Sequence, residues 1–320
     1  MRRFSTIAAL LVGALALAAP AFADNAGLTP VQPESPSAEG IRVIYWILVV
    51  VTGIIGLLVE GALLVFVLRY RRGRRPVAAE GPQVHGNTRL EVLWTVVPVL
   101  IVVFLVGMVL LKLPEIANVP EARAGGGENF KVQIEGRRYY WQYTYPDGSI
   151  TYDTLVVPVS RPVELAISAP AWDVVHSWWV PALNGKMDAI PGITNQWWFE
   201  AKREGEYEGN CTEFCGLQHS AMVTKVRAVP EARLDAELRR LAGNGKEQFD
   251  AACAKCHNVE GPRLVGPTLK GSPTLQNRES LRTLLENGRG KMPPVGRDWT
   301  DEQFDTLFRY VSRIAGTGGG

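Results

Sequence analysis

The sequence predicts a multidomain protein that combines a two-helix transmembrane hairpin, an all-β Greek-key domain and a small all-α domain. Two long apolar stretches, a middle region of short alternating runs and a final region with helical spacing predict these parts in order. A chain of 320 residues is long enough for several domains. The formal net charge of +2, with no basic tract interleaved with aromatic residues, argues against nucleic-acid binding.

The first 23 residues have the features of a secretory signal peptide. Arg2 and Arg3 precede an apolar core, and Ala21-Phe22-Ala23 fits an A-x-A cleavage site. An N-terminal membrane anchor is the alternative, but this core is short for a membrane span. We therefore expect the mature chain to begin outside the cytoplasm.

Two apolar stretches follow, and each is long enough to cross a bilayer. The first is interrupted only by Glu60, and the second carries no charge. We expect a transmembrane hairpin over residues 41–113, with helices at about 43–68 and 92–112. Glu60 either faces protein or a cavity at membrane depth, or lies near the inner headgroups, and the sequence leaves both positions open.

A cluster of arginines between the two helices sets the expected topology. The positive-inside rule places this loop in the cytoplasm. The mature N-terminus and everything after about Leu113 then lie outside, in agreement with the signal peptide. The cluster consists of Arg69, Arg71, Arg72, Arg74 and Arg75.

Residues 128–228 have the pattern of a β domain. From Phe130 onward apolar residues alternate with polar ones, as in strands with one buried face. Asp147-Gly148 marks a hairpin turn, and several prolines separate short runs. About 100 residues of short strands predict a small β-sandwich or Greek-key barrel.

The sequence CTEFCGLQHSAM, from Cys211 to Met222, gathers soft metal donors at the end of this region. Two extracytoplasmic cysteines can form a disulfide, but a disulfide needs neither His219 nor Met222 beside it. Thiolate, imidazole and thioether together favour copper. Zinc is the other alternative, and it rarely uses a thioether.

The second cysteine, Cys215, bears on the number of metal ions. A blue-copper site needs one cysteine, whereas two thiolates can each bridge two ions. A second histidine must then come from elsewhere in the chain. His85 falls in the cytoplasmic loop and His257 belongs to another motif, so His176 is the candidate.

A c-type haem attachment sequence, CAKCH, lies in the last part of the chain. Cys253 and Cys256 would form thioether bonds to the haem, and His257 is placed to ligate the iron. Met292 is the only methionine after this motif and the candidate second ligand, with a core side chain as the alternative. His/Met ligation suits electron transfer because it raises the reduction potential and leaves no open position for oxygen.

Residues 229–244 read as a charged, helical linker, and residues 245–315 as the small helical domain that carries the haem motif. A helix from about Asp301 to Ile314 would close this domain. Its apolar face would consist of Phe304, Leu307, Phe308 and Val311.

The motif CTEFCGLQHSAM resembles the binuclear copper-A loop of subunit II of haem–copper cytochrome c oxidases. DVVHSWW, KMDAIPG and GRRYYWQYTYPDG resemble companion segments of that family, over about Ile41 to Val229. The resemblance implies a cupredoxin-like fold in which Cys211 and Cys215 bridge two copper ions. It also implies that the Glu213 carboxylate reaches a magnesium or manganese ion shared with subunit I. The remaining copper ligands that it implies are His176, His219, Met222 and the backbone carbonyl of Glu213.

Residues 245–315 resemble a class I cytochrome c, and the whole chain resembles the haem-c-fused subunit II of caa3-type oxidases. The resemblance implies a relay from an external donor through one covalent haem c and copper-A to the haems of subunit I. Oxygen reduction and proton pumping would occur in that partner, because this chain has no spare histidines for a haem–copper site. The expected partners are subunit I, subunit III and a donor such as a cytochrome c or an upstream complex. The expected location is the inner cell membrane, with the redox domains on the periplasmic side.

Two further positions match the family. Glu91 in RLEVLWTVVP is similar to the carboxylate at the cytoplasmic mouth of a proton channel into subunit I, although the helix dipole alone would also favour a carboxylate there. Tyr139 replaces the tryptophan at which many relatives receive electrons from soluble cytochrome c, which puts direct docking in question. Trp141 remains nearby, although an aromatic residue in a strand most often belongs to the core.

Two other functions fit part of the sequence. The chain could serve another reductase, since nitrous oxide reductases also carry copper-A, but those relatives lack the helix hairpin and have no use for Glu91. A copper-delivery or storage protein would explain the donor cluster but leaves the haem motif unexplained. The oxidase reading accounts for all of these features.

Overall fold

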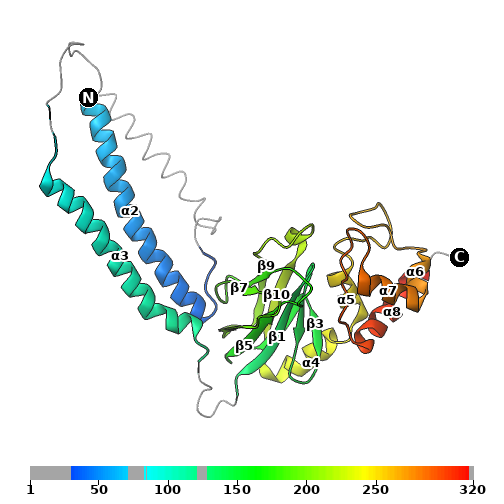
Figure 1. Ribbon diagram of the computed structural model, residues 1–320. Helices are drawn as coiled ribbons and strands as arrows, with labels where there is room; N and C mark the ends of the chain where they lie inside the picture. Colours follow the sequence, from blue (N-terminus) through cyan, green and yellow to red (C-terminus); the bar gives the residue numbers. More distant parts are fainter. Residues whose placement is uncertain (1–29, 71–82, 84, 121–127, 317–320) are drawn as a thin grey trace, which may run out of the picture. The chain divides into compact units, whose positions relative to one another are not determined.

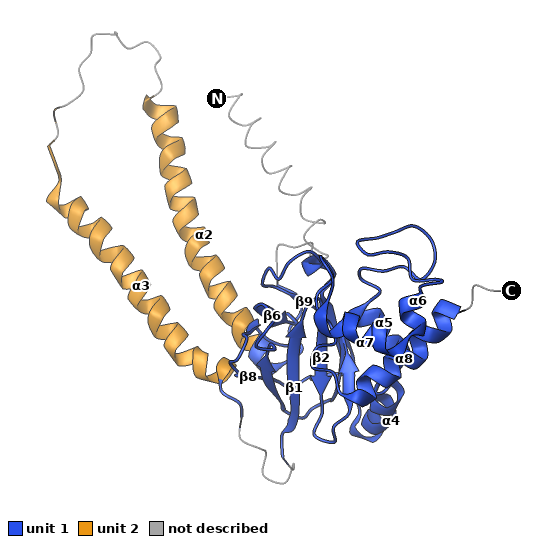
Figure 2. Cartoon of the chain, turned by 45° about the vertical axis from the view of Figure 1, so that its right-hand side comes forward, with its two compact units in different colours: residues 1–38, 118–320 blue, residues 39–117 orange. Residues whose placement is uncertain are grey.

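The computed structural model describes residues 30–70, 83, 85–120 and 128–316. The predicted signal peptide, residues 1–23, and four members of the arginine cluster, Arg71, Arg72, Arg74 and Arg75, lie outside the described residues. The chain divides into two compact units, one of residues 39–117 and one of residues 1–38 with 118–320 (Figure 2).

The smaller unit is formed almost entirely by helices α2 (Pro36–Tyr70) and α3 (Thr88–Ala117) (Figure 1). Their 35 and 30 residues correspond to lengths of about 50 and 45 Å, more than the roughly 30 Å of a hydrocarbon core. Both are long and apolar enough to span a membrane. Gly40 allows the two helices to approach, because a Cβ there would lie 2.9 Å from Cγ1 of Ile116.

The β domain is a sandwich of two five-stranded sheets, with strand orders β3-β2-β1-β5-β8 and β4-β10-β9-β6-β7. The pairs β1/β5 and β4/β10 are parallel, and the other neighbours are antiparallel. This arrangement confirms the predicted cupredoxin-like fold class. The strands are β1 (Phe130–Arg137), β2 (Tyr140–Thr144), β3 (Ile150–Tyr152), β4 (Thr154–Pro158), β5 (Val163–Ser168), β6 (His176–Trp179), β7 (Met187–Ala189), β8 (Asn195–Phe199), β9 (Gly205–Cys211) and β10 (Val223–Val229).

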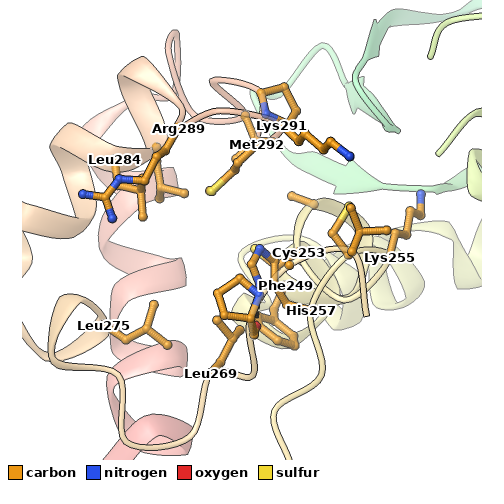
Figure 3. A pocket seen from close by; sticks show the side chains of 18 of the residues that line it. Phe249, Cys253, Lys255, His257, Leu269, Leu275, Leu284, Arg289, Lys291 and Met292 are labelled. Carbon is orange, nitrogen blue, oxygen red and sulfur yellow. Dashed lines mark hydrogen bonds between the residues drawn. The ribbon is translucent and has the colours of Figure 1, made fainter. Parts of the chain in front are cut away.

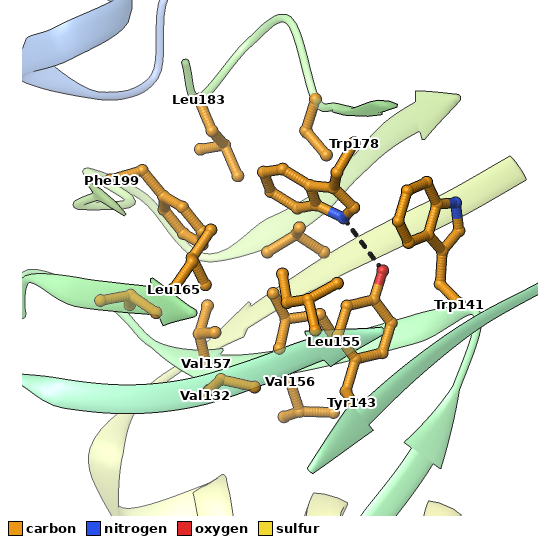
Figure 4. Packing of buried hydrophobic residues seen from close by; sticks show 14 of the residues in the cluster. Val132, Trp141, Tyr143, Leu155, Val156, Val157, Leu165, Trp178, Leu183 and Phe199 are labelled. Carbon is orange, nitrogen blue, oxygen red and sulfur yellow. Dashed lines mark hydrogen bonds between the residues drawn. The ribbon is translucent and has the colours of Figure 1, made fainter. Parts of the chain in front are cut away.

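Large aromatic side chains fill the space between the two sheets (Figure 4). Trp178 is fully buried and stacks on Phe199, with 6.2 Å between the ring centroids. Its indole Nε1 donates a hydrogen bond to the hydroxyl of Tyr143 at 3.1 Å. Because Trp178 lies two residues after His176 on β6, the packing of this core also fixes the backbone that carries the histidine.

The segment before α2 is attached to the β domain. The backbone N–H of Glu34 donates to the carbonyl of Ala182 at 2.7 Å, and the N–H of Lys202 donates to the carbonyl of Glu34 at 2.8 Å. The Glu34 carboxylate forms an ion pair with Arg203. The chain is therefore held against the β domain immediately before the helix begins.

Helix α4 (Glu231–Leu241) connects the β domain to the last domain. Its leucines at positions 234, 238 and 241 are buried and belong to the core cluster of the β domain. Their spacing of four and three residues places them on one helix face. The predicted linker is thus a helix that packs on the sandwich.

The last domain contains four helices, α5 (Gly245–Ala252), α6 (Pro273–Gln276), α7 (Arg278–Asn287) and α8 (Asp301–Gly316). Asn244 and Asn277 cap α5 and α7, since their side chains accept from the N–H groups of Lys246 and Ser280 at 3.0 and 2.8 Å. The buried face of α8 contains Phe304, Leu307 and Val311, whereas Phe308 is half-buried and stacks on Phe304. Tyr140 and Tyr152 of the β domain belong to the same core cluster.

Candidate functional site

The candidate copper ligands come from two neighbouring strands and the loop that follows one of them. His176 begins β6 and Cys211 ends β9, and the register of these strands places Cys211 opposite Trp178. The loop then turns back through Gly216, whose φ of +122° favours glycine. A short 3₁₀ turn, His219–Ala221, brings the chain to Met222 at the start of β10.

All six candidate ligands lie together at this corner. The Sγ atoms of Cys211 and Cys215 are 4.0 Å apart, about twice the length of a disulfide bond. Cys215 Sγ lies 3.6 Å from Nδ1 of His219 and 3.8 Å from Sδ of Met222. Cys211 Sγ lies 3.2 Å from the carbonyl oxygen of Glu213, and ligand atoms of His176 and both cysteines lie within 4.8 Å of one another.

The burial and chemistry of these donors fit copper. His176 is fully buried, and neither of its ring nitrogens has a hydrogen-bond partner among the described residues. An unpartnered buried nitrogen is costly, and a metal ion would satisfy it. Two thiols, two imidazoles and a thioether match the preference of copper better than that of zinc.

The two thiols affect each other's ionisation strongly. A hydrogen bond with Cys215 lowers the pKa of Cys211 even though burial opposes the change. The Cys211 sulfur, together with burial, raises the pKa of Cys215. A single thiolate is therefore favoured without metal. Bound cations would compensate the charge of both sulfurs and allow the second one to ionise.

Asp173 is a buried residue beside this site that the sequence did not single out. Burial raises the pKa of this carboxyl, but interactions with His176 and with the N–H groups of Arg138 and Val174 outweigh burial, so the pKa lies below its usual range. Its Oδ1 accepts from Arg138 Nε at 2.6 Å and lies 3.8 Å from Nε2 of His176. Its position three residues before His176 was the only signal in the sequence.

The haem motif lines a cavity of 470 Å³ in the last domain (Figure 3). Cys253, Cys256 and His257 follow the end of α5, and Met292 faces His257 across the cavity. The structure thus brings together the four candidate haem residues, although Met292 is far from the others in sequence. The other apolar lining residues include Phe249, Leu269, Leu275, Leu281, Leu284, Leu285 and Leu307.

The orientation of His257 fits iron ligation. Its Nδ1 lies 2.8 Å from the carbonyl oxygen of Pro267, which can only accept a hydrogen bond. This bond fixes the tautomer with hydrogen on Nδ1 and leaves the lone pair of Nε2 free for a metal. An apolar cavity with one such imidazole, a thioether opposite and two cysteines at its edge fits a covalently bound haem.

Gly266 is expected to be essential for this cavity. A Cβ at this position would lie 2.2 Å from Cε1 of His257. Gly266→Ala should therefore displace the imidazole and reduce the yield of low-spin His/Met haem in the purified protein. Gly261→Ala, where a Cβ meets nothing within 4 Å but φ is +94°, controls for backbone strain alone. A normal haem spectrum in Gly266→Ala would contradict this account.

The remaining candidate residues occupy three different places. Tyr139 lines the haem cavity, and its hydroxyl accepts a hydrogen bond from the N–H of Leu217 in the copper loop at 3.1 Å. Trp141 is fully buried and meets His176 edge-on, with ring centroids 6.1 Å apart. Glu91 lies in the first turn of α3 and accepts from the N–H of Asn87 at 3.0 Å, while Glu60 is exposed on α2.

Three family models match successive parts of this chain. The model for the transmembrane domain of cytochrome c oxidase subunit II matches residues 23–113, and that for its periplasmic domain matches residues 149–229. The model for subunit III of cbb3-type cytochrome c oxidase matches residues 240–311, which contain the haem motif. These families imply copper-A and haem c, the two groups that the sites fit.

Two relatives found by sequence show the same family. Cytochrome c oxidase subunit 2 of Alkalihalophilus pseudofirmus is 30% identical, over 90% of this chain and 91% of its own length. The Bacillus subtilis protein of that name is 31% identical, over 78% and 81%. The solved periplasmic domain of subunit II from Bradyrhizobium japonicum is 28% identical, covers 41% of this chain and 99% of that domain, and has a TM-score of 0.35. The chain belongs to the cytochrome c oxidase subunit II family, as the membrane-anchored subunit II of a haem–copper oxidase with an extracytoplasmic domain and a C-terminal cytochrome c domain.

Proposed function

We propose that this chain is the subunit through which electrons reach the oxidase, in a complex of the caa3 type. A donor would reduce the haem c of residues 245–315, and the electron would continue to copper-A and then to subunit I. Oxygen would be reduced to water there, coupled to proton pumping. The observation that supports this order most is that the haem cavity and the copper loop meet, with Tyr139 lining the cavity and bonded to the loop.

Each candidate residue has a defined task in this proposal. The copper pair would be held by the six donors around Cys211 and Cys215, and the haem by Cys253, Cys256, His257 and Met292. When bound, these groups supply one-electron redox centres, and the chain fixes their positions and excludes water from them. The exposed Glu213 carboxylate is free to reach a magnesium or manganese ion at the surface that meets subunit I.

The remaining assignments concern the membrane and the partners. Residues 1–23 would be removed as a signal peptide, and the arginine-rich loop would remain in the cytoplasm. Subunits I and III would surround the hairpin. Glu91 would lie at the cytoplasmic mouth of a proton channel, and its bond to Asn87 would position it at the start of α3. The donor would be a cytochrome c or an upstream complex.

A double variant that lacks two of the four candidate haem residues tests the relay. Cys256→Ser combined with Met292→Leu removes one thioether and the axial ligand, whereas Met108→Leu in α3 is the matched control. In the assembled oxidase, stopped-flow reduction of copper by the donor should slow by about 100-fold, because the tethered haem no longer supplies electrons at high effective concentration. Equal rates in the double variant and the control would show that the haem is not on the path.

A further inference from the structure

A hydrogen bond from a side chain of the copper loop to a backbone carbonyl of the haem motif joins these two segments. The side-chain Nε2 of Gln218 donates to the carbonyl of Lys255 at 2.5 Å. Gln218 directly precedes His219, and Lys255 directly precedes Cys256. Burial raises the pKa of the Cys256 thiol, and an interaction with the Gln218 side chain offsets only part of this rise. The Gln218 side chain, next to the candidate copper ligand His219, therefore contacts the segment that carries the haem-binding Cys256.

The lysine side chain fixes the position of this contact. Lys255 Nζ donates to the Asp153 carboxylate at 2.5 Å and to the backbone carbonyl of Tyr139 at 2.8 Å. The two charged side chains are only 13% and 20% exposed, and Asp153 also accepts from the N–H of Trp141 at 2.9 Å. Burial holds the pKa of Asp153 above its ordinary value, although the Lys255 ammonium lowers it in part. Removing one member of such a pair leaves the other charge uncompensated, so the pair resists separation.

The surrounding interface holds the two domains in this arrangement. Tyr140 is fully buried, its hydroxyl donates to the carbonyl of Val295 at 3.0 Å, and it accepts from Trp299 Nε1 at 3.0 Å. Gln303 Nε2 donates to the hydroxyl of Tyr152 at 2.9 Å. A buried, hydrogen-bonded interface of this kind holds the tethered haem domain in one position against the β domain.

We propose that Gln218 positions the haem motif against the copper loop and provides the main bonded connection for electron transfer between them. This rests on the proposed function. With both groups bound, the ferrous haem held by Cys253, Cys256, His257 and Met292 would lose one electron and become ferric, and the oxidised copper pair would gain that electron, with no covalent bond formed or broken. Electron tunnelling weakens steeply across gaps without bonds. The proposed path runs from Cys256 to the Lys255 carbonyl, across one hydrogen bond to the Gln218 side chain, and along the backbone to His219. Apart from that short hydrogen bond, every step of the path is covalent.

A second connection runs through Tyr139. Its ring lines the haem cavity, and its hydroxyl accepts from the N–H of Leu217. This bond is 3.1 Å long, and it reaches the loop one residue further from His219 than Gln218 does. We expect this connection to carry less of the transfer. Tyr139→Phe keeps the ring and removes only the hydroxyl, so it measures this second connection separately.

The test compares Gln218→Leu with Gln196→Leu, an exposed glutamine on β8, in the assembled oxidase. A light pulse in the presence of a photoreductant reduces the haem c, and the decay of its reduced band gives the rate of transfer to copper. We expect this rate to fall several-fold in Gln218→Leu and to change less in Tyr139→Phe. The midpoint potentials of haem and copper and the copper content should stay unchanged in both, which separates loss of connection from loss of driving force.

The results of this experiment test the role of Gln218 separately from the proposed electron relay. A wild-type rate in Gln218→Leu, with fast transfer in the parent protein, would overturn the role of Gln218 and leave the relay intact. Failure of the parent haem to pass its electron to copper would overturn the relay itself. If Gln218→Leu loses copper, Gln218→Glu replaces it, because a carboxylate of similar size cannot donate to the Lys255 carbonyl when ionised. Wild-type transfer in Gln218→Glu would equally refute the role of Gln218.

Discussion

Replacing Cys215 by serine is expected to abolish the paired copper centre and oxidase turnover. The Sγ of Cys215 lies within 4.0 Å of the Cys211, His219 and Met222 ligand atoms, so it is the most central donor. A serine hydroxyl does not ionise near neutral pH and is a poor ligand for a soft metal. Changes in outer partners of metal ligands cost about 10- to 100-fold in metal affinity, and loss of this donor should cost more than about 100-fold.

Metal analysis and paramagnetic resonance of the purified protein measure this effect. Wild-type protein should contain two coppers that share one unpaired electron, and Cys215→Ser should contain no such pair. Cys253→Ser is the matched control, because it removes a cysteine from the haem motif and should leave the copper spectrum unchanged. A shared-electron spectrum in Cys215→Ser, or a lone zinc in the wild-type protein, would contradict the copper assignment.

Trp178→Ala is expected to produce the largest loss of stability in the β domain. The substitution removes a fully buried indole that stacks on Phe199, and it removes one of the two hydrogen-bond partners of the Tyr143 hydroxyl, the other being Thr224. Such large-to-small changes in a core cost about 3–5 kcal/mol of unfolding free energy. Copper affinity should fall as well, because Trp178 lies opposite Cys211 in the sheet.

Chemical denaturation of the purified full chain gives the change in unfolding free energy. Val223→Ala is the control, because this side chain is 43% exposed and the substitution should alter stability by no more than about 0.5 kcal/mol. A loss below about 1 kcal/mol in Trp178→Ala would mean that the cavity is refilled by neighbouring side chains.

The fold class followed from local patterns and could be predicted well. Long apolar stretches predict membrane-spanning helices because only helices of such length satisfy their backbone in lipid. The helices extend past the predicted apolar stretches, from Pro36 and to Ala117, because polar residues continue a helix without contributing to the apolar pattern. The metal and haem candidates were visible because their donors lie within short, dense motifs such as CAKCH.

Contacts between distant residues left no such local trace. Asp153 and Lys255 are 102 positions apart, and Asp153 in isolation suggests only a turn, in keeping with its φ of +52°. Gln218 lies inside the copper motif, and its contact with Lys255 is 37 positions away in sequence. The attachment of Glu34 to Arg203 was equally hidden, because two single charges 169 positions apart form no local pattern. These contacts depend on how distant segments pack together, and the spacing of apolar residues along the chain carries no information about that packing.

The burial of Tyr140 and Tyr152 beneath the last domain has a consequence for shortening this chain. Without the last domain, the β-sandwich would expose the side chains of Tyr140 and Tyr152 to water. Asp153 would also lose its ion pair with Lys255. A chain that ends at α4 should therefore tend to aggregate unless the exposed residues of β2 and β3 and Asp153 are replaced by residues suited to a surface. The two domains therefore share one buried aromatic cluster, and neither has a complete surface without the other.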